Sequence, residues 1–512
     1  MATGLSRRMF LAATMALPAC GPLRESKGAG LARKLVAMYA VRGRDAERWG
    51  GRGPTVEIGG VVVLRRVAYR DDLLFPSACA ALLENSNLDD ARLGAWLLEG
   101  TSPAGRKEAM GVARAYLKHK DPVTRFHILK SLLELGDLKT VAAATEGSRV
   151  PHEIGLHRLT AALPGSASAP EFMPGACFWY EGQEGDFGAA QFEKLARFGV
   201  CEVSFHTFDP LQQGKHNPVL REGRRFGLSN LAPWVQAAKR SSIAVTFKPH
   251  LEMGFRRLTD AERKILTEAG EGEKRGLRAS LDQERAEAGW HGEIEMKSLA
   301  DWRRWFEGYA AYLLEHARSA ALAGVSTFCV GRELDRTVLG AESLWRALIR
   351  DVRSVFPGRL VYSAHHDTFD RLPFWDALDV IGVSAYPQVS HNVPPVMAEV
   401  EAGWGTFVTR CDAASSRVRR PVAWTEVGYP AVDTAAGEPW RENTSEANVI
   451  LQSDLLATAL SAARAGSSIR GSCVWLWEGV SDPPFRDRSF TVQDKPAAFA
   501  MAGVYQGFRT GR

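Results

Sequence analysis

The chain has 512 residues, of which 45% are hydrophobic and 24% are charged, and its formal net charge is +5. These values are typical of a globular protein with a sizeable core, and the length indicates two or three domains. The basic residues are spread along the chain rather than clustered, which argues against a nucleic-acid partner.

The first twenty residues predict export rather than folded structure. Ser6-Arg7-Arg8-Met9-Phe10-Leu11 resembles a twin-arginine motif, and Leu17-Pro18-Ala19-Cys20-Gly21 resembles a bacterial lipoprotein cleavage box. We predict a signal peptide over residues 1–20 and lipidation of Cys20, which would tether the protein to a membrane of the bacterial cell envelope, facing the periplasm or the outside. The alternative is an ordinary cleaved signal with an incidental cysteine.

Six cysteines follow Cys20, and their spacing matches no metal-binding knuckle. Four of them lie in predicted strands and are expected to be small buried apolar residues: Cys177, Cys201, Cys329 and Cys473. Because twin-arginine export moves protein already folded in the reducing cytoplasm, we expect no disulfide framework.

The region before residue 165 divides into a tether and a helical domain. Residues 21–59 are rich in Gly and Arg and predict a tether with room for a short hairpin, whereas residues 60–165 have apolar residues at three- and four-residue spacing. That spacing predicts helices over Ala78–Leu98, Ala104–Leu117 and Pro122–Leu135. Asp121-Pro122-Val123-Thr124-Arg125 resembles a HEAT-type repeat, with Asp90-Ala91-Arg92 as an earlier unit. A plain helical bundle packed on the next domain is equally compatible, and either arrangement leaves room for a protein partner.

Residues 164–170 form a linker by composition, and strands then alternate with helices over residues 170–512. The eight predicted strands are Gly175–Tyr180, Cys201–Phe205, Ala244–Lys248, Ser326–Val330, Leu360–Ser363, Val380–Ala385, Val422–Thr425 and Ser472–Trp477. Eight such units predict a (β/α)8 TIM barrel, an α/β fold. A doubly wound sheet is the alternative, but Gly182-Gln183-Glu184-Gly185 lacks the spacing of a phosphate-binding turn. The charged stretch Phe255–Gly289 predicts a helical insertion over the top face.

Two glutamates follow predicted strands of this barrel. Glu333 comes just after the fourth strand and Glu426 ends the seventh. The carboxyl ends of barrel strands surround the active site, and strands four and seven face each other across it. A pair of carboxylates about 5–5.5 Å apart is the equipment of a retaining glycosidase.

The sequence around these glutamates resembles clan A glycoside hydrolases, and most closely glycoside hydrolase family 113, whose members act on β-1,4-mannan. The resemblance spans about residues 175–498 and rests on Gly331-Arg332-Glu333-Leu334 and Trp424-Thr425-Glu426-Val427-Gly428-Tyr429. Further matching runs are Lys248-Pro249-His250, Trp290-His291-Gly292-Glu293-Ile294, Trp305-Phe306-Glu307-Gly308-Tyr309, the segment 374–383 and Lys495-Pro496-Ala497.

The resemblance implies a role for each candidate residue. It implies that Glu333 is the acid/base, that Glu426 is the nucleophile and that Tyr386 hydrogen-bonds the nucleophile, although a tyrosine beside Pro387 could simply cap its strand. Trp477 could form the floor of the cleavage subsite, with Trp475 as the other member of the pair. Further candidates for substrate binding near the top face are His206, His250, His365 and Trp290, and His366 lies beside them.

Arg332 departs from the family pattern, which has a small hydroxyl residue before the acid. A guanidinium that reached Glu333 would lower the pKa of its carboxyl, whereas a general acid needs a raised pKa. Arg332 therefore either points away or serves the substrate, for example by pairing with an acidic sugar. Since the histidines match no local ligand motif, we expect neither a catalytic metal nor any other cofactor.

Together these patterns predict an envelope-tethered retaining glycosidase acting on a β-linked, mannan-like polysaccharide or oligosaccharide through a covalent intermediate. A non-catalytic barrel lipoprotein that binds glycan or anchors an assembly is the main alternative. A third possibility, a scaffold built on the helical region, would show a large exposed apolar groove between Val61 and Leu163.

Overall fold

The computed structural model describes residues 28–39, 55–58, 61–64, 74–161, 172–178, 186–212, 214–221, 228–253, 289–441, 446–478 and 483–510, with short stretches between 261 and 280. The predicted signal peptide, Cys20 and the linker at 164–170 lie outside these residues, as does most of the predicted insertion Phe255–Gly289.

Eight parallel strands close into a barrel, as the sequence predicts. They are β3 (Met173–Phe178), β4 (Glu202–Gln212), β6 (Ala244–Met253), β7 (Thr327–Arg332), β8 (Arg359–His365), β9 (Val380–Ala385), β10 (Val422–Val427) and β11 (Ile469–Trp477). Their order is β3-β11-β10-β9-β8-β7-β6-β4, and the pairing of β3 with β4 closes the ring. A short strand, β5 (Leu220–Arg221), pairs antiparallel with the end of β4.

Helices cover the outside of the barrel, which explains why its strands are apolar on both faces. They are α9 (Asp186–Arg197), α10 (Leu228–Arg240), α13 (Leu299–Ala323), α14 (Asp335–Gly340), α15 (Glu342–Val355), α16 (Met397–Val418), α17 (Val449–Ala465) and α18 (Pro496–Thr510), joined by short 3-10 turns η3 (His291–Glu293), η4 (Phe369–Arg371) and η5 (Trp375–Ala377). The longest of them, α13, begins where the Ser298 hydroxyl accepts from the Asp301 amide and ends at Gly324, whose φ of 75° suits a glycine cap.

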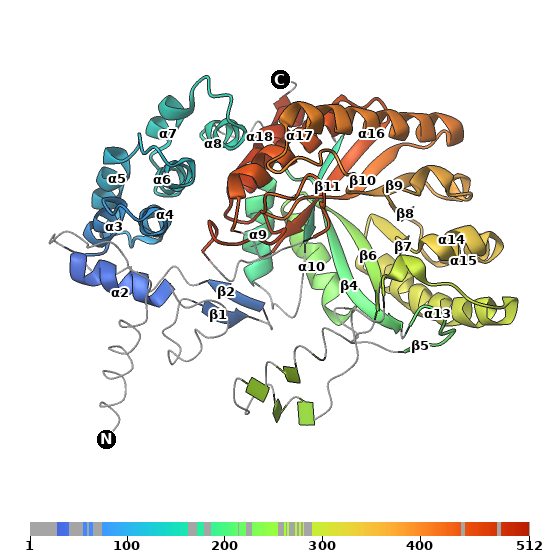
Figure 1. Ribbon diagram of the computed structural model, residues 1–512. Coiled ribbons are helices and arrows are strands. Elements are labelled where there is room, and N and C mark those ends of the chain that lie inside the picture. Colours follow the sequence, from blue (N-terminus) through green and yellow to red (C-terminus); the bar gives the residue numbers. More distant parts are fainter. Residues whose placement is uncertain are drawn as a thin grey trace.

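The N-terminal region is helical and lies beside the barrel (Figure 1). It contains α2 (Ala29–Tyr39), α3 (Phe75–Leu83), α4 (Leu88–Leu97), η2 (Leu98–Gly100), α5 (Arg106–Ala115), α6 (Pro122–Glu134), α7 (Leu138–Thr145) and α8 (Pro151–Leu159). The pattern over Ala78–Leu98 is thus two helices, α3 and α4, because a turn precedes Asn87, whose side chain caps α4. A hairpin of β1 (Thr55–Ile58) and β2 (Val61–Leu64) precedes α3.

Helix α2 differs from the tether predicted over residues 21–59. Its apolar residues Leu31, Leu35 and Tyr39 are buried in the same core as α3, and the Tyr39 ring meets the Trp96 ring edge-on at 5.5 Å. The sequence signal is weak because α2 is short and its neighbours are rich in Gly and Arg. This part of the predicted tether is therefore a packed helix.

An Asp–Arg contact joins α4 to the start of α6. The Asp121 carboxylate caps α6 by accepting from the Thr124 amide at 2.8 Å, and it also accepts from Nε and Nη2 of Arg92 at 3.0 and 2.9 Å. Both residues belong to the motifs that suggested repeats, so the motif has a structural role here. The assignment as HEAT-type remains a prediction.

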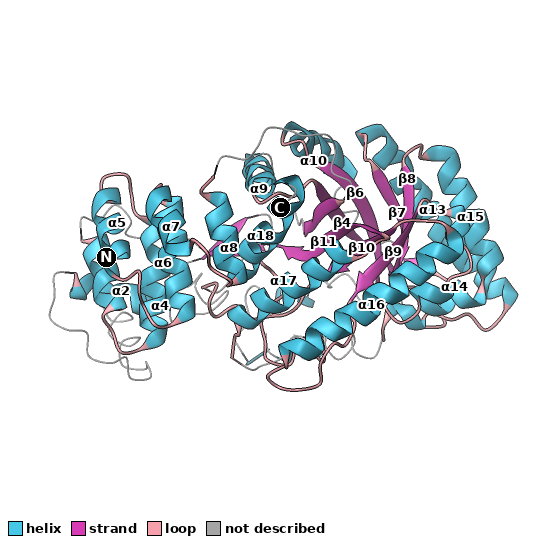
Figure 2. Ribbon diagram, turned by 90° about the horizontal axis from the view of Figure 1, so that it is seen from above, coloured by secondary structure: helices cyan, strands magenta, loops and turns pink. Residues whose placement is uncertain are grey.

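The helical region contacts the barrel mainly through its last helix, with further contacts from α4 and α6. Helix α8 packs on α18 (Figure 2), where Gly155 allows the close approach because a Cβ there would overlap the Phe499 carbonyl. The Phe126 and Phe499 rings lie 5.2 Å apart, and Arg486 pairs with Asp89 at 3.0 Å. Among the described residues, no helix combines the length and the apolarity needed to cross a membrane.

Candidate active site

Glu426 lies in the interior of the barrel because β10 changes register just before it. Trp424 packs outward, 4.8 Å from the Trp404 ring of α16, and strict alternation would send Glu426 the same way. The pairing of β10 with β9 shifts between these two residues, an irregularity of the kind that re-aims side chains near active sites. Glu426 is 2% exposed and faces β6.

Two donors hold the two oxygens of the Glu426 carboxylate. Lys248 on β6 donates to Oε1 at 2.5 Å, and the Tyr386 hydroxyl, just after β9, donates to Oε2 at 3.1 Å. Burial alone would lower the pKa of Lys248, but the charge and hydrogen bond of Glu426 together with smaller contributions outweigh it, and the net shift is upward. Burial, then Glu426, raises the pKa of Tyr386 well above its usual value, so its phenol stays a donor. The two donors orient the Glu426 carboxylate.

Glu333 follows β7 in a backbone conformation that is rare outside glycine, with φ at 47°. Its amide donates to the Ser363 carbonyl at 2.8 Å, and its side chain is buried. Non-glycine residues in this region carry strain of about 1–3 kcal/mol and gather at functional sites. The local backbone therefore fixes the direction of the Glu333 carboxylate.

Arg332 does not point away from Glu333. Its Nη1 lies 3.7 Å from Oε2 of Glu333, and the same oxygen lies 3.4 Å from Nε2 of His291 in η3. Burial would raise the pKa of the Glu333 carboxyl, but Arg332 first, and then His291 and His365, lower it well below its usual range. These neighbours therefore favour the ionised form of Glu333.

Two histidines and a tryptophan form an aromatic cluster beside Glu426. The His206 ring on β4 lies 4.8 Å from the His250 ring on β6 and 5.1 Å from the Trp475 ring, and His250 stacks on Trp475 at 6.2 Å. Burial, followed by the charges of Lys248 and Arg332, lowers the pKa of both histidines well below the usual value. Both rings are therefore neutral.

These histidines and Glu426 also have a spacing that a metal ion could use, since one ligand atom from each lies within 4.8 Å of the others. Lys248 already occupies Oε1 of Glu426, however, and Lys248 and Arg332 both act on the histidine rings. A divalent cation there would meet two positive charges. The absence of a catalytic metal remains our prediction.

The candidates His365 and Trp290 lie together on the side of Glu333. Their rings are 5.0 Å apart, Trp290 is 37% exposed, and its ring lies 5.5 Å from the His291 ring. His366 stacks on Trp440, which is 49% exposed, at 6.0 Å. This group presents aromatic faces to solvent, as sugar-binding surfaces do.

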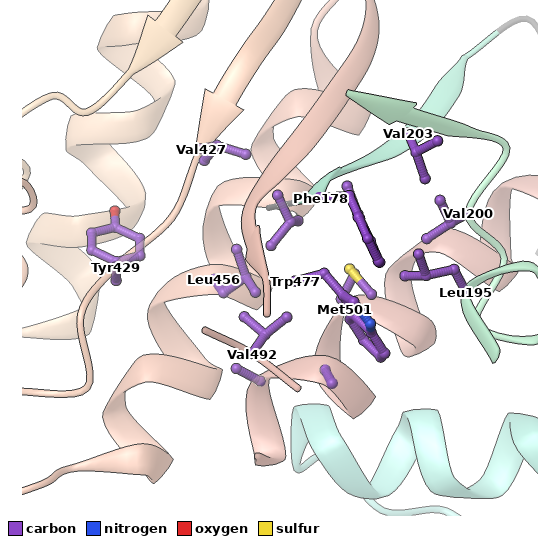
Figure 3. Close-up of a cluster of buried hydrophobic side chains, with 14 of the residues drawn as sticks. Phe178, Leu195, Val200, Val203, Val427, Tyr429, Leu456, Trp477, Val492 and Met501 are labelled. Carbon is purple, nitrogen blue, oxygen red and sulfur yellow. The ribbon is translucent and has the colours of Figure 1, made fainter. Parts of the chain in front are cut away.

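Trp477 is not in the site, contrary to the prediction that it forms the subsite floor. Its ring is buried between the barrel and its covering helices (Figure 3), 5.8 Å from Phe198, and its Nε1 donates to Gln191 at 3.0 Å. The pairing of β11 with β3 shifts between Val474 and Trp477, which breaks the alternation that gave both tryptophans one direction. Trp475 takes the inward position instead.

Sequence reasoning assigned no role to Lys248 or His291. Lys248 had a signal, because it is the one charged residue of the predicted apolar strand Ala244–Lys248. His291 lies in a loop segment whose distance from Glu333 no local pattern reveals.

The fold and this pair of carboxylates define the class. A (β/α)8 barrel with buried glutamates at the carboxyl ends of β7 and β10, one held by a lysine and a tyrosine, is the framework of a glycoside hydrolase. The sequence model of Glycoside Hydrolase Family 113 matches residues 230–495, which is more than half of the chain. The protein therefore belongs to glycoside hydrolase family 113.

Solved structures share the fold. A GH113 β-mannanase from Alicyclobacillus acidocaldarius, in complex with ManMIm, is similar with a TM-score of 0.53 and 22% identity, covering 66% of this chain and 98% of that one. A GH113 β-1,4-mannanase complex gives a TM-score of 0.52 at 22% identity, covering 65% of this chain and 99% of the other. No curated protein matches the chain.

Proposed function

We propose that the protein is a retaining glycosidase that cleaves a β-linked, mannan-like polysaccharide or oligosaccharide, with Glu426 as nucleophile and Glu333 as acid/base. The observation that carries the proposal is the double support of Glu426 by Lys248 and Tyr386. The charges of Glu426 and Glu333 both raise the pKa of Tyr386, and both act on His291, so the two carboxylates share one electrostatic environment.

In the proposed reaction, a Glu426 oxygen attacks the anomeric carbon while the bond to the leaving oxygen breaks. Protonated Glu333 gives its proton to that oxygen, which leaves as a hydroxyl. Glu333, now ionised, then takes a proton from water, and this water attacks the anomeric carbon to release Glu426. Tyr386 and Lys248 stabilise the Glu426 carboxylate before attack and after release.

Two features support a sugar substrate of this kind. Trp475 and Trp290 offer ring faces on which a sugar can stack, and the neutral rings of His206 and His250 can exchange hydrogen bonds with hydroxyl groups. The related solved structures are named as β-mannanases, which supports a β-1,4-linked mannan-like backbone.

The experiment compares the anomer first released with that of the substrate, by NMR on β-1,4-manno-oligosaccharides. Retention is expected, together with a loss of turnover of about 10⁴-fold or more in Glu426→Gln. Glu401→Gln, on the exposed face of α16, is the matched control and should keep full activity. Azide added to Glu426→Ala should restore turnover and give a glycosyl azide of inverted configuration. An inverted sugar product from the wild type would refute the retaining assignment.

One observation favours a second candidate, a barrel that binds glycan without cleaving it. The Arg332–Glu333 ion pair at 3.7 Å favours the ionised form of the candidate acid, which cannot then donate a proton. This candidate predicts that β-linked oligosaccharides raise the melting temperature while reducing ends never appear.

We also propose that lipidation of Cys20 tethers the protein to the cell envelope, as the sequence around that residue suggests. Radiolabelled palmitate should enter the wild type and be absent from Cys20→Ala, which should be released into the soluble fraction. Labelling of the variant would exclude Cys20 as the site. The large exposed apolar residues of α3–α8 and their caps are single and scattered (Leu74, Leu88, Leu138 and Val150), so they do not favour a scaffold function among the described residues.

A further inference from the structure

Two ion pairs lie at the two candidate carboxylates of the site. Lys248 pairs with Glu426, and Arg332 pairs with Glu333. The proposed reaction, however, needs a proton on Glu333 before the glycosidic bond breaks. That proton removes the negative charge from the second pair and leaves the Arg332 guanidinium facing a neutral carboxyl.

The surroundings of Arg332 make this change costly. Its side chain is 16% exposed, and its charge lowers the pKa of His206, His250 and His291, whose rings are therefore neutral. Charges interact strongly in such poorly solvated positions, and losing one member of a buried pair is strongly unfavourable. The hydroxyl groups of a neutral sugar bring no charge to replace the one that protonation removes.

A carboxylate on the substrate would replace it. The planar guanidinium of arginine matches a carboxylate with two parallel hydrogen bonds, which neither a hydroxyl nor an ammonium can reproduce. Arg332 lies 3.7 Å from Glu333, and its side chain is 16% exposed, so a substrate carboxylate can compete with Glu333 for the guanidinium. A uronic acid, in which the sugar's terminal carbon is a carboxylate, is the simplest substrate unit with this group.

We propose that Arg332 binds the carboxylate of a uronic acid unit in the substrate, and that this exchange of partners lets Glu333 take up a proton from solvent. The inference on catalysis rests on the proposed glycosidase function, whereas the inference on recognition does not. The protein would then act on an acidic, β-linked counterpart of mannan and discriminate against the neutral polymer.

Several titratable groups near Glu333 bear on this exchange, and they include His366 and Tyr386, whose pKa values the Glu333 charge acts to raise. Arg332 on β7, His291 in η3 and His365 on β8 favour the ionised form, while Asp335 on α14 lies behind His365, 3.9 Å away. A substrate carboxylate would add negative charge and engage Arg332, and both effects raise the pKa of Glu333. The pH at which cleavage falls off on the alkaline side should therefore be higher for an acidic substrate than for a neutral one.

The test uses pairs of oligosaccharides that differ only in oxidation of the terminal carbon: β-1,4-mannohexaose against β-1,4-mannuronate hexamer, and cellohexaose against its uronate. Release of reducing ends gives kcat/KM, and the shift in melting temperature gives binding. The wild type should prefer the uronate of at least one pair by about tenfold or more in kcat/KM. The pH at which kcat/KM declines on the alkaline side should also be higher with the uronate than with the neutral sugar.

Two variants separate charge from geometry. Arg332→Met should abolish the preference. Arg332→Lys should retain a fraction of it, because an ammonium keeps the charge but cannot form the two parallel hydrogen bonds of a guanidinium. With neutral oligosaccharides, moreover, the activity of Arg332→Met should persist to a higher pH on the alkaline side than that of the wild type. A purely structural role for Arg332 would instead lower both rates equally and leave the pH profiles in place.

The outcomes distinguish the inference from the proposed function. Cleavage of the neutral hexamer with no gain from the uronate overturns the inference and leaves the function intact. Uronate-dependent stabilisation that Arg332→Met removes, without cleavage, upholds recognition and overturns the hydrolase. A mannohexaose sulfated on its terminal carbons serves as a further substrate, and an equal preference for it overturns the assignment to a carboxylate. The absence of both binding and cleavage for every uronate overturns the inference outright.

Discussion

The helical region buries Lys130 against carboxylates and the barrel buries Lys248, yet the two lysines have different surroundings. Lys130 on α6 lies 2.5 Å from Glu99 and 3.4 Å from Asp494, and it is 1% exposed. Lys248 on β6 is equally buried and lies 2.5 Å from Glu426. Burial and pairing alone therefore do not tell a functional lysine from a structural one.

What differs is the origin and nature of the neighbouring groups. Asp494 is shared between Lys130 and Lys194, so this network ties helices of two regions together. Around Lys248, residues from β4, β6, β10 and β11 converge on one point, and they include neutral histidines and an aromatic face. Convergence of different polar groups from separate strands, rather than a buried ion pair, marks the site.

The strongest way to test this contrast is to remove Lys248. Lys248→Met leaves Glu426 buried without its main partner, so we expect a loss of about 3–5 kcal/mol in the free energy of unfolding. Turnover should also fall by about 100-fold or more, because the nucleophile loses its orienting charge. Urea denaturation and initial rates measure the two effects.

The double variant Lys248→Met with Glu426→Gln is the control. It removes both charges, so most of the stability should return while activity stays absent. Normal turnover in the single variant would show that Lys248 only fills space.

Lys130→Met should lower stability without lowering activity, in contrast to Lys248→Met. Its loss leaves Glu99, which is 3% exposed at its side chain, as a buried charge, and we expect a decrease of about 3 kcal/mol in unfolding free energy. Because Lys130 lies between α6 and the barrel's outer surface, kcat should stay unchanged below the unfolding transition. The same denaturation and rate measurements apply.

A surface pair gives the matched comparison for Lys130. Arg353 pairs with Asp379 at 2.7 Å with more than a third of each side chain exposed, so Arg353→Met should cost less than about 1 kcal/mol. A fall in kcat for Lys130→Met would mean that the helical region acts on the barrel site.

The sequence was sufficient for the barrel and for part of its site. Continuous apolar runs at regular intervals predict strands covered on both faces, and each of the eight predicted runs overlaps a barrel strand. The position of Glu333 and Glu426 at the carboxyl ends of these strands then follows from topology. Tyr386 hydrogen-bonds Glu426, as the family resemblance implied. For Arg332 the sequence left two alternatives, and the structure rules out the one in which it points away from Glu333.

Features that depend on local register or on distant contacts were out of reach. The irregular pairing at Trp477 and Glu426 decides which side chain faces inward, and no propensity encodes it. The partners of Lys248 and His291 come from strands and loops far along the chain. Helix α2 is also short and owes its stability to packing on α3 rather than to its own sequence.

A further prediction contrasts two aspartates with opposite pKa shifts. Burial alone would raise the pKa of Asp121, but hydrogen bonds from Arg92 and Thr124 outweigh it and lower the pKa to about 2. Asp121 thus stabilises the folded state above its unfolded pKa of about 4, and this contribution is lost as pH falls toward 2. Since Arg92 is partly exposed, we expect about 1–2 kcal/mol.

In the barrel, burial raises the pKa of Asp335 to about 6, with opposite consequences. Its contribution favours the folded state below the unfolded pKa of about 4 and is lost as pH rises through 6. Urea midpoints between pH 3 and 7 should therefore show a loss for Asp121→Asn that is largest at neutral pH and shrinks below pH 4. For Asp335→Asn, the difference from the wild type should instead change between pH 4 and 6. Parallel pH curves for the two variants would mean that Asp121 and Asp335 titrate alike. That result would contradict the opposite pKa shifts on which this comparison of the two regions rests.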